Sequence, residues 1–285
     1  MDACAQYNDP AIAKFLEGPS EERIAFLAAD WKFDLPASRL LETKLLRLID
    51  YPDRDRPRCM LVLGYSGMGK THVARQVRNF HPSNQNDPKG IVERPVLYFQ
   101  VEPKPTVYGI LCAAAEAADI PVRNVEQRNL HSHIKHQLEA LELRMVIVDE
   151  VQTLLNVKPH VAQPCCDLLK WFGNITRRPV VALGTPDAVS LFNRDPQLKS
   201  RFRRFELPRW ELSTELQQFV KAILMRLPLK LPWDPKLLEE EGLRQILKYS
   251  DRTTGGILDC LKEAAIDAIF DGRESITVKD LQSMG

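Results

Sequence analysis

The chain has 285 residues, of which 44% are apolar and 27% charged, and a formal net charge of +1. This composition is typical of a soluble globular protein, and the length allows one large domain or two small ones. The sequence has neither a run of about 18 apolar residues nor a basic-then-apolar signal segment, so we expect a cytoplasmic protein with no membrane partner. A charge near zero leaves nucleic acid open as a partner, because any basic surface must then be local.

Helical patterns come first along the chain. Short amphipathic helices are predicted within residues 1–30, an irregular and partly aromatic connector over 31–36, and a helix with a leucine-rich face over 37–48. A charged link that contains prolines follows at 51–58. We therefore expect residues 1–50 to form a short N-terminal helical extension.

The next predicted element is a buried strand over 60–63, followed by G-Y-S-G-M-G-K-T and by a helix over 71–80. A strand, then G-x-x-x-x-G-K-T, then a helix is the P-loop pattern in its structural context. Glycines allow backbone N–H groups to face phosphate oxygens, and the helix N-terminus adds partial positive charge. We expect Lys70 to reach the β- and γ-phosphates of ATP and the Thr71 hydroxyl to hold Mg²⁺. The predicted nucleotide-binding residues are Gly64, Tyr65, Ser66, Gly67, Met68, Gly69, Lys70 and Thr71, together with Asp149 described below.

A third strand carries the predicted acidic residues of the site. The elements that precede it are a strand over 95–101 and helices over 106–118 and 125–143. Residues 145–148 are apolar and end in Asp149-Glu150, which is the Walker B pattern. Such a strand delivers two carboxylates to the carboxyl edge of the sheet, where ligands bind in open α/β folds. We expect Asp149 to hold Mg²⁺, directly or through water, and Glu150 to orient or deprotonate the attacking water.

The fourth predicted strand, 179–185, ends in the hydroxyl of Thr185. A hydroxyl at this edge can hydrogen-bond the γ-phosphate or the attacking water, so Thr185 is a candidate phosphate sensor. A helix N-cap ahead of Pro186 is an alternative role for the same side chain. The two roles are compatible.

A short fifth strand is predicted over 205–207, directly after the basic run K-S-R-F-R-R at 199–204. One interpretation of that run is a solvated or DNA-facing basic turn. The other is an arginine finger, which stabilises charge on a phosphate bound by a neighbouring subunit. The arginines of this run are Arg201, Arg203 and Arg204.

The remainder of the chain has only helical patterns, at 214–227, 235–249, 257–270 and 278–284. We therefore expect three parts: the N-terminal extension over 1–50, an α/β nucleotide-binding domain with five strands over 51–208, and a helical lid over 209–285.

Taken together, these motifs resemble the AAA+ ATPase superfamily, and within it the TniB/TnsC regulators of DNA transposition. The superfamily resemblance rests on the P-loop and on M-V-I-V-D-E, L-G-T and S-R-F-R-R-F. The narrower resemblance rests on R-I-A-F-L-A-A-D-W-K-F-D-L-P-A-S-R-L-L-E-T-K-L at 23–45, I-V-D-E-V-Q-T-L-L at 147–155 and A-L-G-T-P-D-A at 182–188. It covers about residues 20–270, and it implies an AAA+ parallel five-stranded sheet flanked by helices, with a small helical lid.

The resemblance also implies a nucleotide-dependent switch. Proteins of this kind assemble on double-stranded DNA as ATP-bound rings or helical filaments and recruit a DDE transposase and a TniQ-like targeting protein. ATP hydrolysis, weak alone and stimulated by partners, then drives disassembly. The S-R-F placement just before the last strand is where AAA+ proteins such as clamp loaders carry a finger, which points to Arg201, with Arg203 and Arg204 as close rivals. The segment after the second strand and the following helix face the duplex in this family, which points to Lys104, Arg123 and Asn124 as DNA contacts. Ordinary solvated loop charges are the alternative for these residues.

One position departs from the superfamily pattern. An arginine often follows the glycine-containing turn at the start of a lid helix, but here the stretch at 254–258 is followed by Asp259, and Arg252 lies before the glycines. A nucleotide contact from the lid is therefore in doubt. Two other functions stay open: a helicase loader related to DnaC and IstB, and a nucleotide-gated signalling module that does not touch DNA. Salt-dependent binding to duplex DNA would exclude the signalling module, because such binding requires phosphate contacts. A preference for duplex over single-stranded DNA would exclude the helicase loader.

Overall fold

The computed structural model describes residues 10–83 and 94–282. The chain divides into two compact units. The sheet unit consists of Asp34–Tyr65 and Gly69–Leu207, and the helical unit consists of the residues up to Phe33, Ser66–Met68 and the residues from Pro208 onward. Within the described ranges, no helix combines the length and the apolar character needed to cross a membrane.

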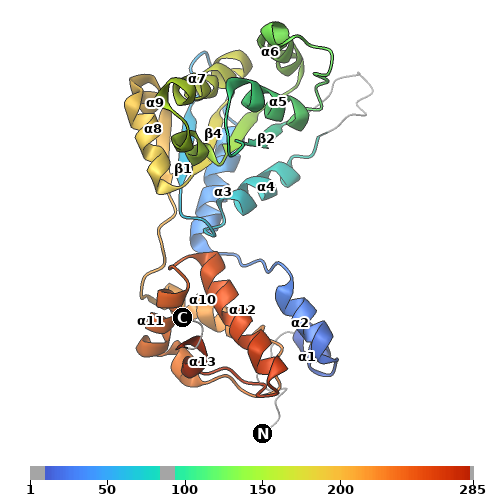
Figure 1. The fold of residues 1–285 in the computed structure, drawn as a ribbon, viewed down its shortest axis with the longest axis vertical. Coiled ribbons are helices and arrows are strands. Elements are labelled where there is room, and N and C mark those ends of the chain that lie inside the picture. The colour runs from blue at the N-terminus through green and yellow to red at the C-terminus, as the bar shows by residue number, and fades with distance from the viewer. Residues whose placement is uncertain (1–9, 84–93, 283–285) are drawn as a thin grey trace. The chain divides into compact units, whose positions relative to one another are not determined.

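The sheet unit contains five parallel strands in the order β2-β3-β4-β1-β5 (Figure 1). Their bounds are β1 Cys59–Leu63, β2 Val96–Gln100, β3 Met145–Asp149, β4 Val180–Gly184 and β5 Phe202–Glu206. Strands β3 and β4 are buried at every residue, as expected for a parallel sheet covered by helices on both faces. The predicted α/β class with a five-stranded parallel sheet is confirmed.

The fifth strand starts earlier than its apolar pattern predicts. It begins at Phe202 and includes Arg203 and Arg204, because it pairs with β1 from Cys59↔Phe202 to Leu63↔Glu206. An edge strand tolerates exposed cations, and its extent is decided by main-chain pairing rather than by side-chain polarity. The basic run is therefore divided between the end of a helix and the edge of the sheet.

Seven helices flank the sheet in the described part of this unit. They are α3 Pro36–Ile49, α4 Lys70–Phe80, α5 Val107–Ala117, α6 Leu130–Ala140, α7 Pro159–Thr176, α8 Val189–Arg194 and α9 Pro196–Arg201. The helix predicted over 125–143 is shorter at both ends. A 3₁₀ turn at Gln127–Asn129 precedes it, and the backbone becomes extended at Leu141. The sequence did not indicate α7, whose 18 residues include Pro159 and Pro164. In a sequence pattern, proline predicts the end of a helix. Pro159 lies in the first turn, which tolerates proline, whereas Pro164 lies inside the helix.

The helical unit is built from both ends of the chain. Its helices are α1 Pro10–Leu16, α2 Ser20–Ala28, α10 Thr214–Leu224, α11 Glu240–Tyr249, α12 Thr254–Phe270 and α13 Val278–Gln282. Helix α2 packs against α12. Residues 1–50, expected to form one extension, are thus divided, with α1 and α2 in the helical unit and α3 in the sheet unit.

A buried ion pair holds the two ends of the chain together. Arg23 is 1% exposed and donates from Nη1 and Nη2 to the two carboxylate oxygens of Glu274, at 2.6 and 2.7 Å. The same guanidinium donates to the carbonyl of Pro228 at 3.1 Å. These bonds hold the pKa of Glu274 below its usual range, and the bonds from Arg23 are the largest cause. This pair fixes α2 to the segment before α13.

Candidate active site

The P-loop connects β1 to α4 and depends on two glycines. Gly67 and Gly69 have φ values of +76° and +82°, in the left-handed region that a side chain disfavours. Gly69 is the N-cap of α4, so Lys70 and Thr71 are the first residues of that helix. The first N–H groups of a helix lack partners within it and favour an anion. The predicted phosphate-binding loop therefore has the local backbone that it needs.

Lys70 is the buried cation of this loop. Its side chain is 8% exposed, and Nζ donates to the carbonyls of Gly64 at 2.6 Å and of Tyr65 at 3.0 Å. Burial lowers the pKa of Lys70, and the negative charges of Asp149 and Glu150 oppose that shift. The ammonium group thus lies at the base of the loop, within the field of the predicted metal ligand Asp149 and of the predicted base Glu150.

Asp149 is fully buried at the end of β3 and accepts three hydrogen bonds. Thr71 Oγ1 donates to it at 2.6 Å, the Tyr98 hydroxyl at 2.9 Å and the Glu150 amide at 2.8 Å. All three donors are uncharged. A hydroxyl and a carboxylate in contact are the hard oxygen ligands that Mg²⁺ prefers. The two predicted metal ligands, Thr71 and Asp149, therefore lie together and fit the ion.

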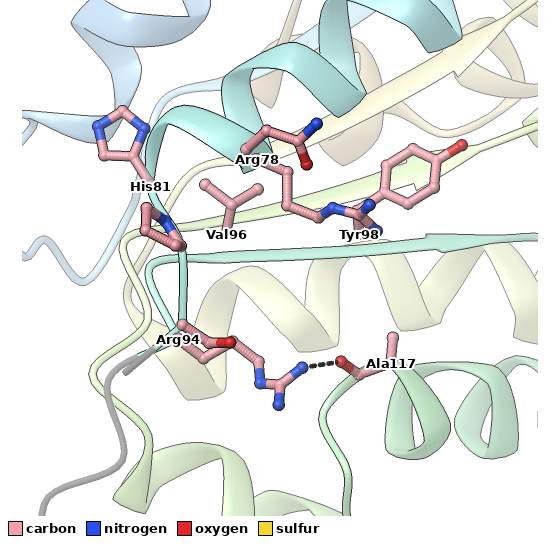
Figure 2. Close-up of a pocket in the computed structure, with 9 residues that line it drawn as sticks. Arg78, His81, Arg94, Val96, Tyr98 and Ala117 are labelled. Atoms are coloured by element: carbon pink, nitrogen blue, oxygen red, sulfur yellow. Dashed lines mark hydrogen bonds between the residues drawn. The ribbon is translucent and has the colours of Figure 1, made fainter. Parts of the chain in front are cut away.

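Sequence reasoning missed Tyr98. It lies on β2, next to β3, where Gln100 is in register with Asp149. Burial is the largest cause of its raised pKa, followed by the charge of Asp149. Tyr98 also lines a pocket of about 470 Å³, in which the Arg78 guanidinium lies 5.6 Å from its ring (Figure 2). The strand register that brings Tyr98 to Asp149 has no signal in the sequence.

Glu150 and Thr185 are joined by a residue that the motifs did not single out, Gln152. The Gln152 amide donates from Nε2 to Glu150 Oε2, and its Oε1 accepts from the Thr185 amide at 3.2 Å. Glu150 itself has a left-handed φ of +60°, which is uncommon for a residue with a side chain and often marks a functional position. Gln152 therefore bonds to the expected base and the expected sensor at once.

The Thr185 hydroxyl is buried and has no hydrogen-bond partner among the described residues. Thr185 occupies the N-cap position of the 3₁₀ turn Pro186–Ala188, but its side chain makes no capping bond there. A buried hydroxyl without a partner is costly in an interior. The donor and acceptor of this hydroxyl are therefore unused within the described residues.

Arg201 lies away from the acidic residues, at the last position of α9. Its Nη1 donates to Asn174 Oδ1 at 2.7 Å, and its Nε is buried without a partner in the described part of the chain. The five residues of β5 that follow span roughly 16 Å toward the carboxyl edge. Within one sheet unit, Arg201 and Asp149 thus lie at opposite ends of the strands.

The three predicted DNA contacts are exposed and fall into two groups. Lys104 follows β2, whereas Arg123 and Asn124 form the turn between α5 and α6. Helix α5, which lies between the two groups in the chain, has 11 residues and is about 16 Å long.

Several solved structures share this fold. The Aeropyrum pernix ORC1 protein in complex with DNA aligns with a TM-score of 0.63 and 20% identity, covering 90% of this chain and 67% of that one. The Aeropyrum pernix ORC2 protein, solved as ADPNP–ADP complexes, aligns with a TM-score of 0.56 and 20% identity over 90% and 70%. Drosophila ORC bound to DNA gives 0.59 and 16% over 93% and 64%. The chain thus spans about two thirds of each of these proteins.

A search of curated protein sequences gave no match. The family model described as the bacterial TniB protein matches residues 23–212, about two thirds of the chain, including the P-loop, Asp149, Glu150 and Thr185. The structural neighbours are AAA+ ATPases. The chain therefore belongs to the TniB family and has the AAA+ fold.

Proposed function

We propose that this protein is an ATP-dependent regulator of DNA transposition that assembles as a homo-oligomer, a ring or a helical filament, on double-stranded DNA. Membership of the TniB family supports the pathway. The observation that carries the ATPase activity is the contact between the P-loop hydroxyl of Thr71 and the fully buried Asp149. In this proposal the oligomer recruits a DDE transposase and a TniQ-like targeting protein, and hydrolysis disassembles it.

Each residue of the site has a distinct task in the proposed hydrolysis. Lys70 pairs with phosphate oxygens, and Thr71 and Asp149 hold Mg²⁺, which neutralises charge on the phosphates. Glu150 orients or deprotonates the attacking water. Thr185 supplies its free hydroxyl to the γ-phosphate or to the water.

Two substitutions test the nucleotide chemistry. Lys70→Ala is expected to abolish ATP binding, because the phosphate charges lose their buried cation. Glu150→Gln is expected to keep binding and to lower hydrolysis by about 10²- to 10⁴-fold, since the amide cannot act as a base. Binding is measured with a fluorescent ATP analogue and hydrolysis by phosphate release, with Glu139→Gln on the solvated end of α6 as the control. Equal hydrolysis by Glu150→Gln and the native protein removes Glu150 from the mechanism.

We propose that Arg201 acts on ATP bound to a neighbouring subunit. The length of β5 between Arg201 and the carboxyl edge supports action in trans, and fingers contribute about 10³- to 10⁵-fold in rate. Arg201→Ala subunits are mixed with Glu150→Gln subunits, so that some interfaces combine an intact finger with an intact base. Partial recovery of hydrolysis is expected. Absence of recovery, with both variants still assembling, counts against Arg201 and directs attention to Arg203 and Arg204.

Contact with DNA is proposed through Lys104, Arg123 and Asn124 in the bore of the oligomer. Each subunit then adds one or two phosphate contacts, which are weak singly and strong once repeated. The double variant Lys104→Ala/Arg123→Ala is expected to bind ATP normally and to lose DNA-dependent assembly, observed by electron microscopy with a slowly hydrolysed ATP analogue.

Preference for single-stranded over duplex DNA would favour the helicase-loader alternative. Failure of purified transposase to stimulate hydrolysis would contradict the proposed partner.

A further inference from the structure

A groove with strong positive charge lies in the sheet unit between α3 and the edge strand β5, near the amino end of β1, whereas the P-loop follows the carboxyl end of that strand. It has a volume of about 460 Å³. Five of the residues that line it are cationic and none is acidic. The cations are Lys44, Arg47, Arg58, Arg203 and Arg204. We call this feature the α3–β5 groove.

No ion pair neutralises the groove cations within the described residues. Lys44 Nζ lies 5.7 Å from the ring centroid of Phe205, and Arg58 donates to the Tyr51 hydroxyl at 2.8 Å. Arg204 donates to the side-chain amide of Asn193. These partners are uncharged, so they orient the cations without removing their charge.

The acidic residues of the neighbouring link are bound elsewhere. Asp53 pairs with Arg178 at 2.5 Å, and Asp55 approaches Arg177 at 3.8 Å. Neither lines the groove. The positive charge of the groove therefore persists although the net charge of the whole chain is only +1.

The chemistry of the lining identifies the ligand class. Four of the five cations are arginines, whose planar guanidinium groups bind phosphate through two parallel hydrogen bonds. Arg47, Arg58, Arg203 and Arg204 are exposed, so the surface is open along its length rather than closed around one small anion. Several exposed cations along one groove suit an extended polyanion with regularly repeated charges.

We propose that the α3–β5 groove binds the phosphate backbone of nucleic acid, as a second contact separate from Lys104 and Arg123. This inference rests on the proposed function, because it takes duplex DNA as the ligand. Backbone contacts of this kind position the protein without reading sequence. The groove thus gives each subunit contacts with DNA that do not depend on the bore.

The test compares the full chain with two groove variants and a matched control. The first variant, Arg47→Gln/Arg203→Gln, changes one cation on each wall. The second, Lys44→Gln/Arg47→Gln, leaves β5 untouched, so a defect of the edge strand cannot decide the result. The control, Arg128→Gln/Lys135→Gln, removes the same charge at exposed positions of the same unit that pair with Glu126 and Glu139. Thermal unfolding and binding of a fluorescent ATP analogue verify that each variant is folded.

Binding to 30-base-pair duplexes of two unrelated sequences is measured by fluorescence anisotropy over a series of salt concentrations. Both groove variants are expected to bind at least tenfold more weakly than the control, equally for both sequences. The slope of log affinity against log salt concentration is expected to fall by about 1.8, or 0.9 for each lost phosphate contact.

Native affinity and slope in the folded groove variants overturn the inference and leave the proposed function standing. A native protein that hydrolyses ATP without binding any duplex overturns both. Groove variants that bind DNA normally but no longer self-associate in sedimentation assign the groove to an acidic protein surface and also overturn it.

Discussion

Each unit contains a carboxylate that is buried or largely buried, Glu274 at 15% and Asp149 at 0% exposure, and the two differ in what neutralises the charge. Glu274 in the helical unit receives both Nη groups of Arg23, so its charge is balanced within the fold. Asp149 in the sheet unit receives hydrogen bonds from two hydroxyls and an amide, and no described cation donates to it. We call Arg23–Glu274 the closed pair, because both charges belong to the protein. We call Asp149 the open carboxylate, because a bound cation can balance its negative charge.

This difference separates a carboxylate that holds structure from one that holds a ligand. Removing one member of a closed buried pair leaves an uncompensated charge and destabilises the fold. Removing the charge of Asp149 leaves no such partner behind, so the loss falls on cation binding. The same reasoning applies to the unpaired groove cations, whose removal is expected to alter binding more than stability.

The largest expected effect is on the closed pair. Arg23→Met keeps much of the side-chain length but leaves the Glu274 carboxylate without its cation. The free energy of unfolding of the helical unit should therefore fall by about 3–5 kcal/mol. Urea denaturation followed by circular dichroism measures it. Arg244→Met, at an exposed pair with Glu240, is the control and should change stability by less than about 0.5 kcal/mol. Equal effects of the two substitutions would show that burial does not distinguish the pairs.

The second prediction concerns the open carboxylate. At 100 times its dissociation constant, Mg²⁺-ATP should stabilise the native protein by about 2.7 kcal/mol. Asp149→Asn should lose most of the part that depends on Mg²⁺, because an amide cannot balance the ion. Thermal unfolding with ATP and either Mg²⁺ or EDTA separates the two parts, and Glu139→Gln is the control. A full Mg²⁺ response in Asp149→Asn would remove this residue from the metal site.

A smaller effect is expected at Gln152, which we place as a positioning residue between Glu150 and Thr185. Gln152→Leu removes both bonds, and kcat should fall about tenfold, equivalent to about 1.4 kcal/mol, with KM for ATP unchanged. Gln152→Glu replaces the donated bond by charge repulsion and should be at least as harmful. A uniform loss of ATP binding would instead indicate a purely structural role.

The smallest expected effect is a pH dependence at Glu274. Arg23 lowers the folded-state pKa of this carboxyl below its unfolded value of about 4.3. Its contribution to stability is therefore complete above that value and is lost as the pH falls through the lowered pKa. Asp34 and Asp195 also have lowered pKa values, so the difference between the native protein and Glu274→Gln isolates Glu274. Parallel stability curves below about pH 4.5 would contradict the shift.

The parts of the site that the sequence predicted are local in the chain. The P-loop needs only consecutive residues between one strand and one helix, and Asp149 is placed by the strand that it ends. Tyr98 and Gln152 were missed because their bonds depend on the β2–β3 register and on the backbone turn after Glu150. Periodicity specifies which face of an element is apolar, but it does not specify which polar groups meet across elements.

The same distinction applies to the fold. The apolar strands over 145–148 and 179–185 were predictable because complete burial leaves a continuous apolar run. The extent of β5 was not, since pairing with β1 overrides the polarity of Arg203 and Arg204. The grouping of α2 with α12 was also hidden, because the partners are distant in sequence. The roles of Arg201, Lys104, Arg123 and Asn124 stay predictions.

The position of Glu274, 251 residues after Arg23, has a consequence for the order in which the chain folds. A ribosome delivers α2 before the sheet unit, whereas α12, against which α2 packs, and the carboxylate of Glu274 are synthesised after it. The sheet unit lies between them in sequence and contains all five strands, so it can fold before the helical unit is complete. During that interval the apolar side chains of Ile12 and Leu27, which are fully buried in the folded protein, belong to a unit that is still incomplete. The nascent chain is thus exposed to aggregation until α12 and Glu274 have been synthesised, and truncation ahead of α12 should leave α2 without the helix against which it packs.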